Sequence, residues 1–99
     1  MSKILEEFPN VIVISDDVYE FLAYEGQYIT FASIRDNYKK TITAYDGGKL
    51  FNATGWTVAW ALGPEYLVKP VAVITSTVVY CSHCPSQVAM ARALDKIND

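Results

Sequence analysis

Three side chains in this sequence have the types and spacing needed to hold and activate an aldehyde. Lys49 follows the turn Asp46-Gly-Gly48, and Asp16 and Tyr19 lie three positions apart, well before it in the chain. A lysine amine can form an imine with an aldehyde, a carboxylate can keep a ring nitrogen protonated, and a phenol can bind a ring hydroxyl. Asp16, Tyr19 and Lys49 are therefore the candidate functional residues.

Two apolar segments are expected to bring these side chains to one edge of a sheet. The continuous apolar run Val11–Ile14 is typical of a strand buried on both faces of a parallel sheet, and Asp16 follows just past its end. Thr41–Tyr45 is the second predicted strand and leads into the glycine turn, whose backbone can pass close to a ligand or reach a positive φ. Ligands of open α/β sheets sit at the carboxyl ends of strands, so we expect a binding site there.

Other elements are predicted around these strands. Helical spacing of apolar residues is found in Ser2–Phe8 and in Ser86–Ile97. Val18–Tyr24 is predicted to be a turn or a short helix, and Thr57–Leu62 a third strand. There are no internal repeats or linkers, so an α/β fold in one domain, or part of one, is the consistent prediction.

Four short motifs then indicate a family. They are Ile14-Ser-Asp-Asp-Val-Tyr-Glu20, Phe31-Ala-Ser33, Gly48-Lys-Leu-Phe-Asn-Ala-Thr-Gly-Trp56 and Trp60-Ala-Leu-Gly-Pro64. In this order and spacing they resemble the class I and II aminotransferases of fold type I, most closely the kynurenine and glutamine transaminases. The resemblance implies an α/β fragment with two parallel core strands and one antiparallel strand, flanked by helices. It also implies amino-group transfer from an amino acid to a 2-oxo acid, with pyridoxal 5′-phosphate as cofactor.

The same resemblance implies a role for each candidate residue. Lys49 would form the imine with the cofactor and move a proton between it and the substrate, Asp16 would pair with the ring nitrogen, and Tyr19 with the ring hydroxyl. Simpler explanations stay open: a surface lysine for Lys49, a helix N-cap for Asp16 and a half-buried aromatic for Tyr19. Trp56 and Trp60 are expected to be packing residues.

Two phosphate-binding positions depart from the family pattern. The family has a serine three residues before the lysine and a basic residue eight after it, and here these positions are Asp46 and Thr57. A carboxylate beside a phosphate is repulsive, by on the order of 4 kcal/mol for each unit charge pair at ~4 Å and an effective dielectric of ~20. Ala59, where the family usually has glycine, is a milder departure. We therefore expect poor affinity for the cofactor.

The segment Val71–Val79 carries contradictory signals. Seven of its nine residues are β-branched, which favours a strand. The resemblance instead places a helix that starts at Pro70, and proline suits a first helical position. We follow the resemblance, and expect a separate short helix to begin at Pro64.

The chain of 99 residues is shorter than the cofactor domain of the family. The resemblance assigns residues 1–99 to the middle-to-late part of that large domain, with the phosphate-binding turn before Met1 and the substrate-binding arginine after Asp99. Three interpretations stay open: a transaminase completed by other parts, a non-catalytic pseudoenzyme with a structural or interaction role, and a truncated gene product. Strands cut from a larger sheet leave an apolar edge unpaired, so we expect a protein partner or an oligomer.

Composition excludes other classes of function. Hydrophobic residues make up 52% and charged residues 19%, which indicates a folded segment. A net charge of −3 gives no electrostatic basis for binding nucleic acid or an anionic membrane. The N-terminus has no signal-peptide pattern, and Val68–Cys81 is too short and too polar for a membrane helix. We expect an intracellular protein, in the cytoplasm or the mitochondrion.

The cluster Cys81-Ser-His-Cys84 has a possible chemistry of its own. Two cysteines at this spacing, with His83 between them, are found in redox pairs and in half of a zinc site. His83 is the only histidine, and a structural zinc site needs four ligands. We expect no metal, and interpret the cluster as a helix junction, because the family has a cysteine or threonine before a proline here.

Overall fold

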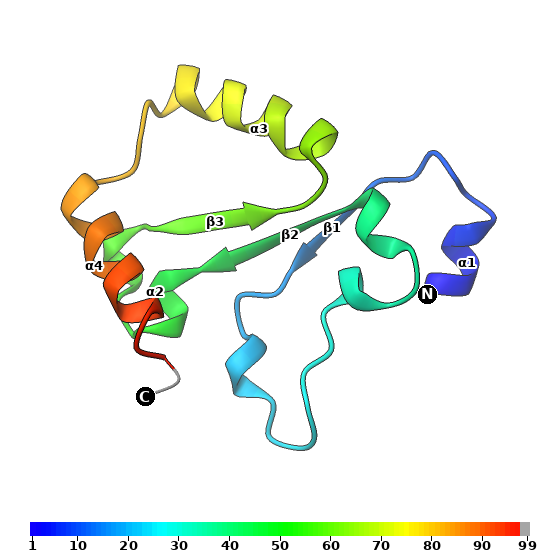
Figure 1. The fold of residues 1–99 in the computed structure, drawn as a ribbon, viewed down its shortest axis with the longest axis horizontal. Helices are drawn as coiled ribbons and strands as arrows, with labels where there is room; N and C mark the ends of the chain where they lie inside the picture. Colours follow the sequence, from blue (N-terminus) through cyan, green and yellow to red (C-terminus); the bar gives the residue numbers. More distant parts are fainter. Residues whose placement is uncertain (98–99) are drawn as a thin grey trace.

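The computed structural model describes residues 1–97 and has a three-stranded sheet at its centre (Figure 1). The strands are β1 (Val13–Asp16), β2 (Thr41–Asp46) and β3 (Ala59–Leu62), in that order across the sheet. β1 and β2 run parallel, whereas β2 and β3 run antiparallel. The expected α/β class, with two parallel strands and one antiparallel strand, is confirmed. Residues 98 and 99 of the predicted domain lie outside the described residues.

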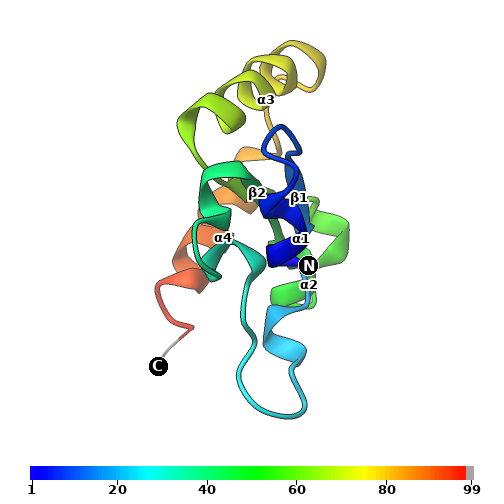
Figure 2. The ribbon, with the colours of Figure 1, turned by 90° about the vertical axis from the view of Figure 1, so that its right-hand side faces the viewer.

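Residues 1–97 also form four α-helices. They are α1 (Ser2–Glu6), α2 (Gly47–Leu50), α3 (Glu65–Val78) and α4 (Cys84–Leu94). Single 3₁₀ turns are formed by Glu20–Leu22, Phe31–Ser33, Asn37–Lys40 and Thr54–Trp56. Figures 1 and 2 show α3 on one side of the sheet and the long connection from β1 to β2 on the other.

The helix predicted from the resemblance at Val71–Val79 is confirmed, and the strand favoured by residue propensity is wrong. One continuous helix, α3, replaces the two short helices that were expected at Pro64 and Pro70, and Pro70 lies inside it. Apolar residues of α3 occur at helical spacing at Leu67, Val71, Ile74 and Val78, which is compatible with a helix although other apolar residues lie between them. Tertiary context overrides the β-branched composition.

The remaining elements agree with the sequence in type and differ at their ends. The helix expected at Ser2–Phe8 stops at Glu6, and the one expected at Ser86–Ile97 begins at Cys84 and ends at Leu94. The predicted turn at 18–24 is the 3₁₀ turn Glu20–Leu22. Such shifts of two or three residues are typical of element boundaries inferred from a sequence.

Burial of β1 on both faces, expected from its apolar run, is wrong. Ile14 is 75% exposed, because β1 is an edge strand and its outer face is uncovered. Only Val58, Leu67 and Met90 are buried apolar residues among those described. The interior is otherwise polar around β2, where Thr41 is fully buried and donates a hydrogen bond of 2.7 Å from Oγ1 to the Asn37 carbonyl.

The helices of residues 1–97 include no candidate for a membrane-spanning segment. None of them combines the length and the apolar character that a bilayer-spanning helix needs.

Candidate active site

The ends of β1 and β2 bring two of the candidate residues to the same edge of the sheet. Asp16 is the last residue of β1 and lies opposite Ala44 of β2. The next residue, Asp17, donates its backbone N–H to the Ala44 carbonyl at 3.0 Å, which fixes the two strand ends together. Lys49 is in α2, which follows β2 without a break. Parallel pairing thus places the carboxylate and the amine at one carboxyl edge.

Asp46 shapes the start of α2 through its side chain. Its Oδ1 accepts a hydrogen bond of 2.7 Å from the N–H of Gly48, which makes it the N-cap of the helix. Its Oδ2 lies 3.8 Å from Nζ of Lys49, and the side chains are 23% and 31% exposed respectively. Lys49 Nζ also lies 3.4 Å from Oγ1 of Thr54. The amine is therefore held between a carboxylate and a hydroxyl of the same turn.

Glycine is needed at position 48 because of close packing. A Cβ there would lie 2.7 Å from Cα of Thr54 and 2.9 Å from Oδ1 of Asp46. Neither Gly47 nor Gly48 has a positive φ, and Gly26 is the described glycine that does. Gly48 therefore lets two segments of the backbone pack closely against each other. The sequence had suggested close packing against a ligand instead.

Thr57, at the second phosphate position, stands apart from this cluster. It ends the 3₁₀ turn Thr54–Trp56 with φ 52° and ψ 44°, in the left-handed region that a β-branched residue rarely adopts. Its side chain is exposed and lines a cavity of about 390 Å³ with His83 and Ser86. No hydrogen bond within residues 1–97 joins it to Asp46 or Lys49.

Tyr19 is at the same end of the sheet as Asp16 but is 57% exposed. Tyr19 is itself the N-cap residue of the 3₁₀ turn Glu20–Leu22, and it makes no side-chain capping hydrogen bond. The alternative that Asp16 is a helix N-cap is therefore wrong. Asp16 is exposed and has no side-chain hydrogen bond among the residues described. The structure gathers Lys49 and Asp46 tightly, and leaves the carboxylate of Asp16 and the phenol of Tyr19 open to solvent.

Asp17 is the residue that the sequence interpretation missed. The residue is 3% exposed, Oδ1 accepts a hydrogen bond of 2.5 Å from Ser15, and Oδ2 has no partner within residues 1–97. Side chains alternate between the two faces of a strand, so Ser15 and Asp17 are expected on the face opposite to Asp16. This alternation along β1 would have indicated that Asp17 is buried.

Three titratable side chains near Asp17 have raised pKa values. Desolvation raises the pKa of Glu20, and the nearby Asp17 carboxylate raises it further. Desolvation also raises the pKa of Tyr28, with smaller contributions from Asp17. The pKa of Tyr45 is raised chiefly by desolvation as well. The Tyr45 ring stacks on Trp60 with centroids 6.2 Å apart, which agrees with the expected packing role of that tryptophan.

The cysteine cluster lies at the start of α4. Cys84 is the first residue of the helix, and both Cys81 and Cys84 are exposed, free thiols. His83 Nδ1 lies 2.9 Å from Oγ of Ser86, within the first turn. Within the part of the chain that the structure describes, no group of three or more His, Cys, Asp or Glu residues is placed to hold a metal ion.

The structure is an α/β chain with a mixed sheet, and Lys49 lies in a short helix directly after the central strand β2. Comparison with known proteins then identifies the family: the family model for aminotransferase class I and II matches residues 1–98, and the chain belongs to that family.

Curated relatives agree with this assignment. Kynurenine-oxoglutarate transaminase 1 from Homo sapiens is 38% identical over 90 residues, which are 88% of this chain and 21% of the human protein. Kynurenine-oxoglutarate transaminase from Dictyostelium discoideum is 37% identical over 91 residues, which are 91% of this chain and 21% of that protein. The chain thus spans about a fifth of the length of these relatives.

Solved structures show the same relation in three dimensions. Bna3p, a putative kynurenine aminotransferase from Saccharomyces cerevisiae, superposes with a TM-score of 0.89 at 30% identity, over 95% of this chain and 22% of its own. N-succinyldiaminopimelate aminotransferase from Mycobacterium tuberculosis gives a TM-score of 0.85 at 36% identity, over 90% of this chain and 23% of its own. The fold of this segment is therefore that of a segment of aminotransferases.

Proposed function

We propose that residues 1–99 form the middle-to-late part of an aminotransferase cofactor domain and do not catalyse transamination by themselves. The family match and the kynurenine transaminase relatives support the origin. In a complete enzyme of this kind, an amino group would pass from an amino acid to a 2-oxo acid. The chain covers about a fifth of such relatives, so the substrate site would need residues from other polypeptide segments.

The residues of this chain fit one half of pyridoxal phosphate. That cofactor supplies an aldehyde for imine formation and a ring that accepts electrons from the substrate carbon. Lys49 would meet the aldehyde, Asp16 the ring nitrogen and Tyr19 the ring hydroxyl. The common edge of β1 and β2, which carries both Asp16 and α2, supports this assignment.

The residues at the two phosphate-binding positions do not fit the phosphate group of the cofactor, and the contact made by Asp46 is the main support for this conclusion. Asp46 fills the position of the phosphate-binding serine with a carboxylate, and this carboxylate already occupies the N–H of Gly48 at 2.7 Å. A phosphate placed there would lose that donor and meet a like charge, at a cost on the order of 4 kcal/mol per charge pair at ~4 Å and an effective dielectric of ~20. Thr57 offers no cation in compensation, since its side chain is neutral and exposed.

Borohydride trapping tests the proposal. The chain is incubated with pyridoxal phosphate, reduced with borohydride, digested, and mapped for lysine adducts by mass spectrometry. We expect Lys49 to be labelled no more than exposed lysines such as Lys39. Labelling confined to Lys49 in the unmodified chain would show that the cofactor is held, and would contradict the proposal.

Restoration of the phosphate site provides the second arm. The double variant Asp46→Ser, Thr57→Lys should label Lys49 at least about ten-fold more, since removal of a repulsion of about 1.4 kcal/mol or more changes affinity by that factor. Asp36→Ser is the matched control, because Asp36 lies 3.0 Å from Nζ of Lys39 on the surface. Equal labelling of Lys49 in the double variant and the unmodified chain would overturn the account of the phosphate site.

A structural or interaction role is the second candidate function, as a pseudoenzyme or as one piece of a larger assembly. The uncovered outer face and edge of β1 favour it, because unpaired strand edges attract other polypeptide segments. Reading the neighbouring coding sequence would separate it from a truncated gene product. A glycine-rich phosphate turn upstream and an arginine downstream would indicate a complete enzyme instead.

A further inference from the structure

The amine of Lys49 lies at an edge of the sheet where carboxylates outnumber it. Oδ2 of Asp46 is 3.8 Å from its Nζ, and the side chains of Lys49 and Asp46 are only 31% and 23% exposed. Asp16 ends β1, the strand that runs parallel beside the one leading into α2. Charges on partly buried groups are screened less by water than charges on exposed groups.

Two further carboxylates act on the end of β2. The pKa of Tyr45, the residue before Asp46, is raised by desolvation and then by the charges of Glu20 and Asp17. The ion pairs formed within residues 1–97 bring no second cation to any of these carboxylates. The electrostatic field around Lys49 is therefore unfavourable to an anionic ligand.

The backbone at the start of α2 offers an anion no compensation. Gly47 donates its N–H to the Val58 carbonyl at 2.9 Å, and Gly48 donates its N–H to Oδ1 of Asp46 at 2.7 Å. Both donors are therefore already used inside the chain. A phosphate group near Lys49 would meet like charges without gaining the hydrogen bonds that usually offset them.

Oδ2 of Asp46 can still accept a hydrogen bond. Among the described residues its polar neighbour is Nζ of Lys49, and 3.8 Å is too long for a hydrogen bond. A hydroxyl group is a neutral donor that brings no repulsion, and hydrogen bonds to an ionised acceptor are about twice as strong as those between neutral groups. This oxygen therefore favours a ligand that carries a hydroxyl near its reactive carbon.

We propose that Lys49 takes an aldehyde that carries a hydroxyl group in place of a phosphate, of the class of pyridoxal. The neutral amine and the aldehyde carbon form a C=N bond, and the two amine hydrogens leave with the aldehyde oxygen as water. The ligand hydroxyl donates to Asp46. This choice of ligand rests on the proposed function for the ring contacts of Asp16 and Tyr19, whereas the selection against phosphate rests on charge.

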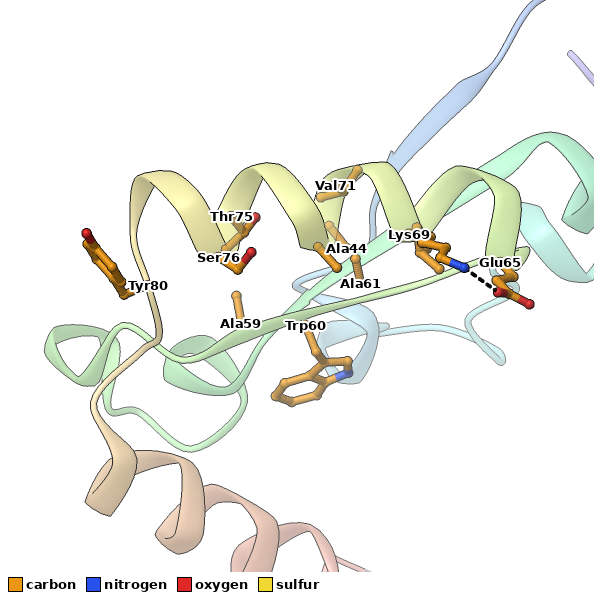
Figure 3. Close-up of a pocket in the computed structure, with 12 residues that line it drawn as sticks. Ala44, Ala59, Trp60, Ala61, Glu65, Lys69, Val71, Thr75, Ser76 and Tyr80 are labelled. Carbon is orange, nitrogen blue, oxygen red and sulfur yellow. Dashed lines mark hydrogen bonds and ion pairs between the residues drawn. The ribbon is translucent and has the colours of Figure 1, made fainter.

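Lys69 provides a comparison within the same chain, because it also lies beside a carboxylate. Its Nζ is 3.4 Å from Oε1 of Glu65, where α3 borders a groove of about 820 Å³ (Figure 3). The side chains of Lys69 and Glu65 are 71% and 82% exposed, so water screens their charges. A phosphorylated aldehyde should therefore meet less repulsion at Lys69 than at Lys49.

Competition labelling of the full chain tests this preference. The chain is reduced with borohydride in an equimolar mixture of pyridoxal and pyridoxal phosphate, and mass spectrometry quantifies both adducts at each lysine. The ratio of pyridoxal adduct to phosphate adduct should be at least about five-fold higher at Lys49 than at Lys69, the factor for one pair of unit charges ~4 Å apart in water. In about 1 M sodium chloride the two ratios should converge, because salt screens the repulsion.

Variants and a modified ligand separate charge from hydrogen bonding. Asp46→Asn removes the charge and keeps a cap acceptor, so it should lower the ratio at Lys49 toward that at Lys69. Asp36→Asn is the matched control, because Asp36 lies 3.0 Å from Nζ of Lys39 on the surface, and it should leave the ratio at Lys49 unchanged. 5-Deoxypyridoxal has a methyl group in place of the hydroxymethyl group, and should label Lys49 less than pyridoxal does, relative to Lys69.

The outcomes distinguish this proposal from the proposed function. Equal ratios at Lys49 and Lys69 in the unmodified chain would overturn it and leave the proposed function standing. Phosphate adducts confined to Lys49 would overturn both, because the phosphate would then be held. A preference that persists in Asp46→Asn or in high salt would overturn the role of the Asp46 charge, and equal labelling by 5-deoxypyridoxal would overturn the role of the hydroxyl.

Discussion

Asp46 makes two contacts through its two carboxylate oxygens, one to the backbone of Gly48 and one to the amine of Lys49. The first contact is a helix-capping hydrogen bond of 2.7 Å, which a neutral backbone N–H donates. The second is an ion pair, with 3.8 Å between Oδ2 and Nζ, and both side chains are partly exposed. Caps of this kind contribute about 1 kcal/mol, whereas exposed ion pairs contribute from about 0 to 1 kcal/mol. The cap is therefore expected to dominate the effect of Asp46 on stability.

Two substitutions at Asp46 separate these contributions. Asp46→Ala removes the cap and should lower the free energy of unfolding by about 1 kcal/mol, while Asp46→Asn keeps a cap acceptor and should lower it by only a few tenths. Urea unfolding of both variants at one protein concentration measures the difference. If the two variants lost the same stability, the ion pair with Lys49 would be the main contribution.

The sequence predicted the identity of the site residues better than their surroundings. Lys49 and Asp16 were placed at one sheet edge correctly, because each follows a predicted strand and parallel strands end at the same edge of a sheet. The cap made by Asp46 and the burial of Asp17 were missed. Both depend on side-chain direction at the end of a strand, which a one-residue shift of boundary reverses.

At the scale of elements, α2 and the following 3₁₀ turn Thr54–Trp56 fold back on each other and hold Lys49 beside Thr54. The types of most elements followed from the sequence, and α3 required the family resemblance because propensity favoured a strand there. Exposure of β1 could not be predicted, because an apolar run does not tell which residues cover it. The close approach at Gly48 is what joins α2 to the next turn.

A methyl group at Gly48 should disturb this junction. Gly48→Ala brings a Cβ to 2.7 Å from Cα of Thr54, a backbone atom that cannot turn aside, and should destabilise the protein by about 1–3 kcal/mol. Gly55→Ala is the control, because nothing lies within 4 Å of its Cβ position. Urea denaturation should show that this control is neutral or slightly stabilised. Similar losses at both glycines would contradict the packing explanation, because Gly55 has nothing within 4 Å of its Cβ position.

At the scale of the whole molecule, the chain has a small apolar interior and a large exposed apolar surface. Val58, Leu67 and Met90 are the buried apolar residues within the described part, whereas Val73, Ile74 and Val78 of α3 are 60%, 63% and 72% exposed. Stability of such a chain is expected to come partly from association, since a partner that binds only the folded state shifts the folding equilibrium. Small domains with few buried apolar groups are marginal without it.

Thermal unfolding should therefore depend on chain concentration. Each ten-fold increase should raise the Tm by on the order of 5 °C, because the coupled association free energy changes by about 0.7 kcal/mol per chain. Differential scanning calorimetry at several concentrations measures this slope. A Tm that is independent of concentration in the unmodified chain would contradict coupled folding and association.

The parallel pairing of β1 with β2 has a kinetic consequence. Residues 47–58 join the antiparallel pair β2–β3, whereas the connection through residues 17–40, which joins β1 to β2, is twice as long and contains only 3₁₀ turns. Closing a loop of double length loses about 0.6 kcal/mol more of chain entropy, and no helix shortens the search. During synthesis β1 leaves the ribosome first, yet it is expected to pair last. The turn that carries Lys49 is then complete before Asp16 reaches the same edge.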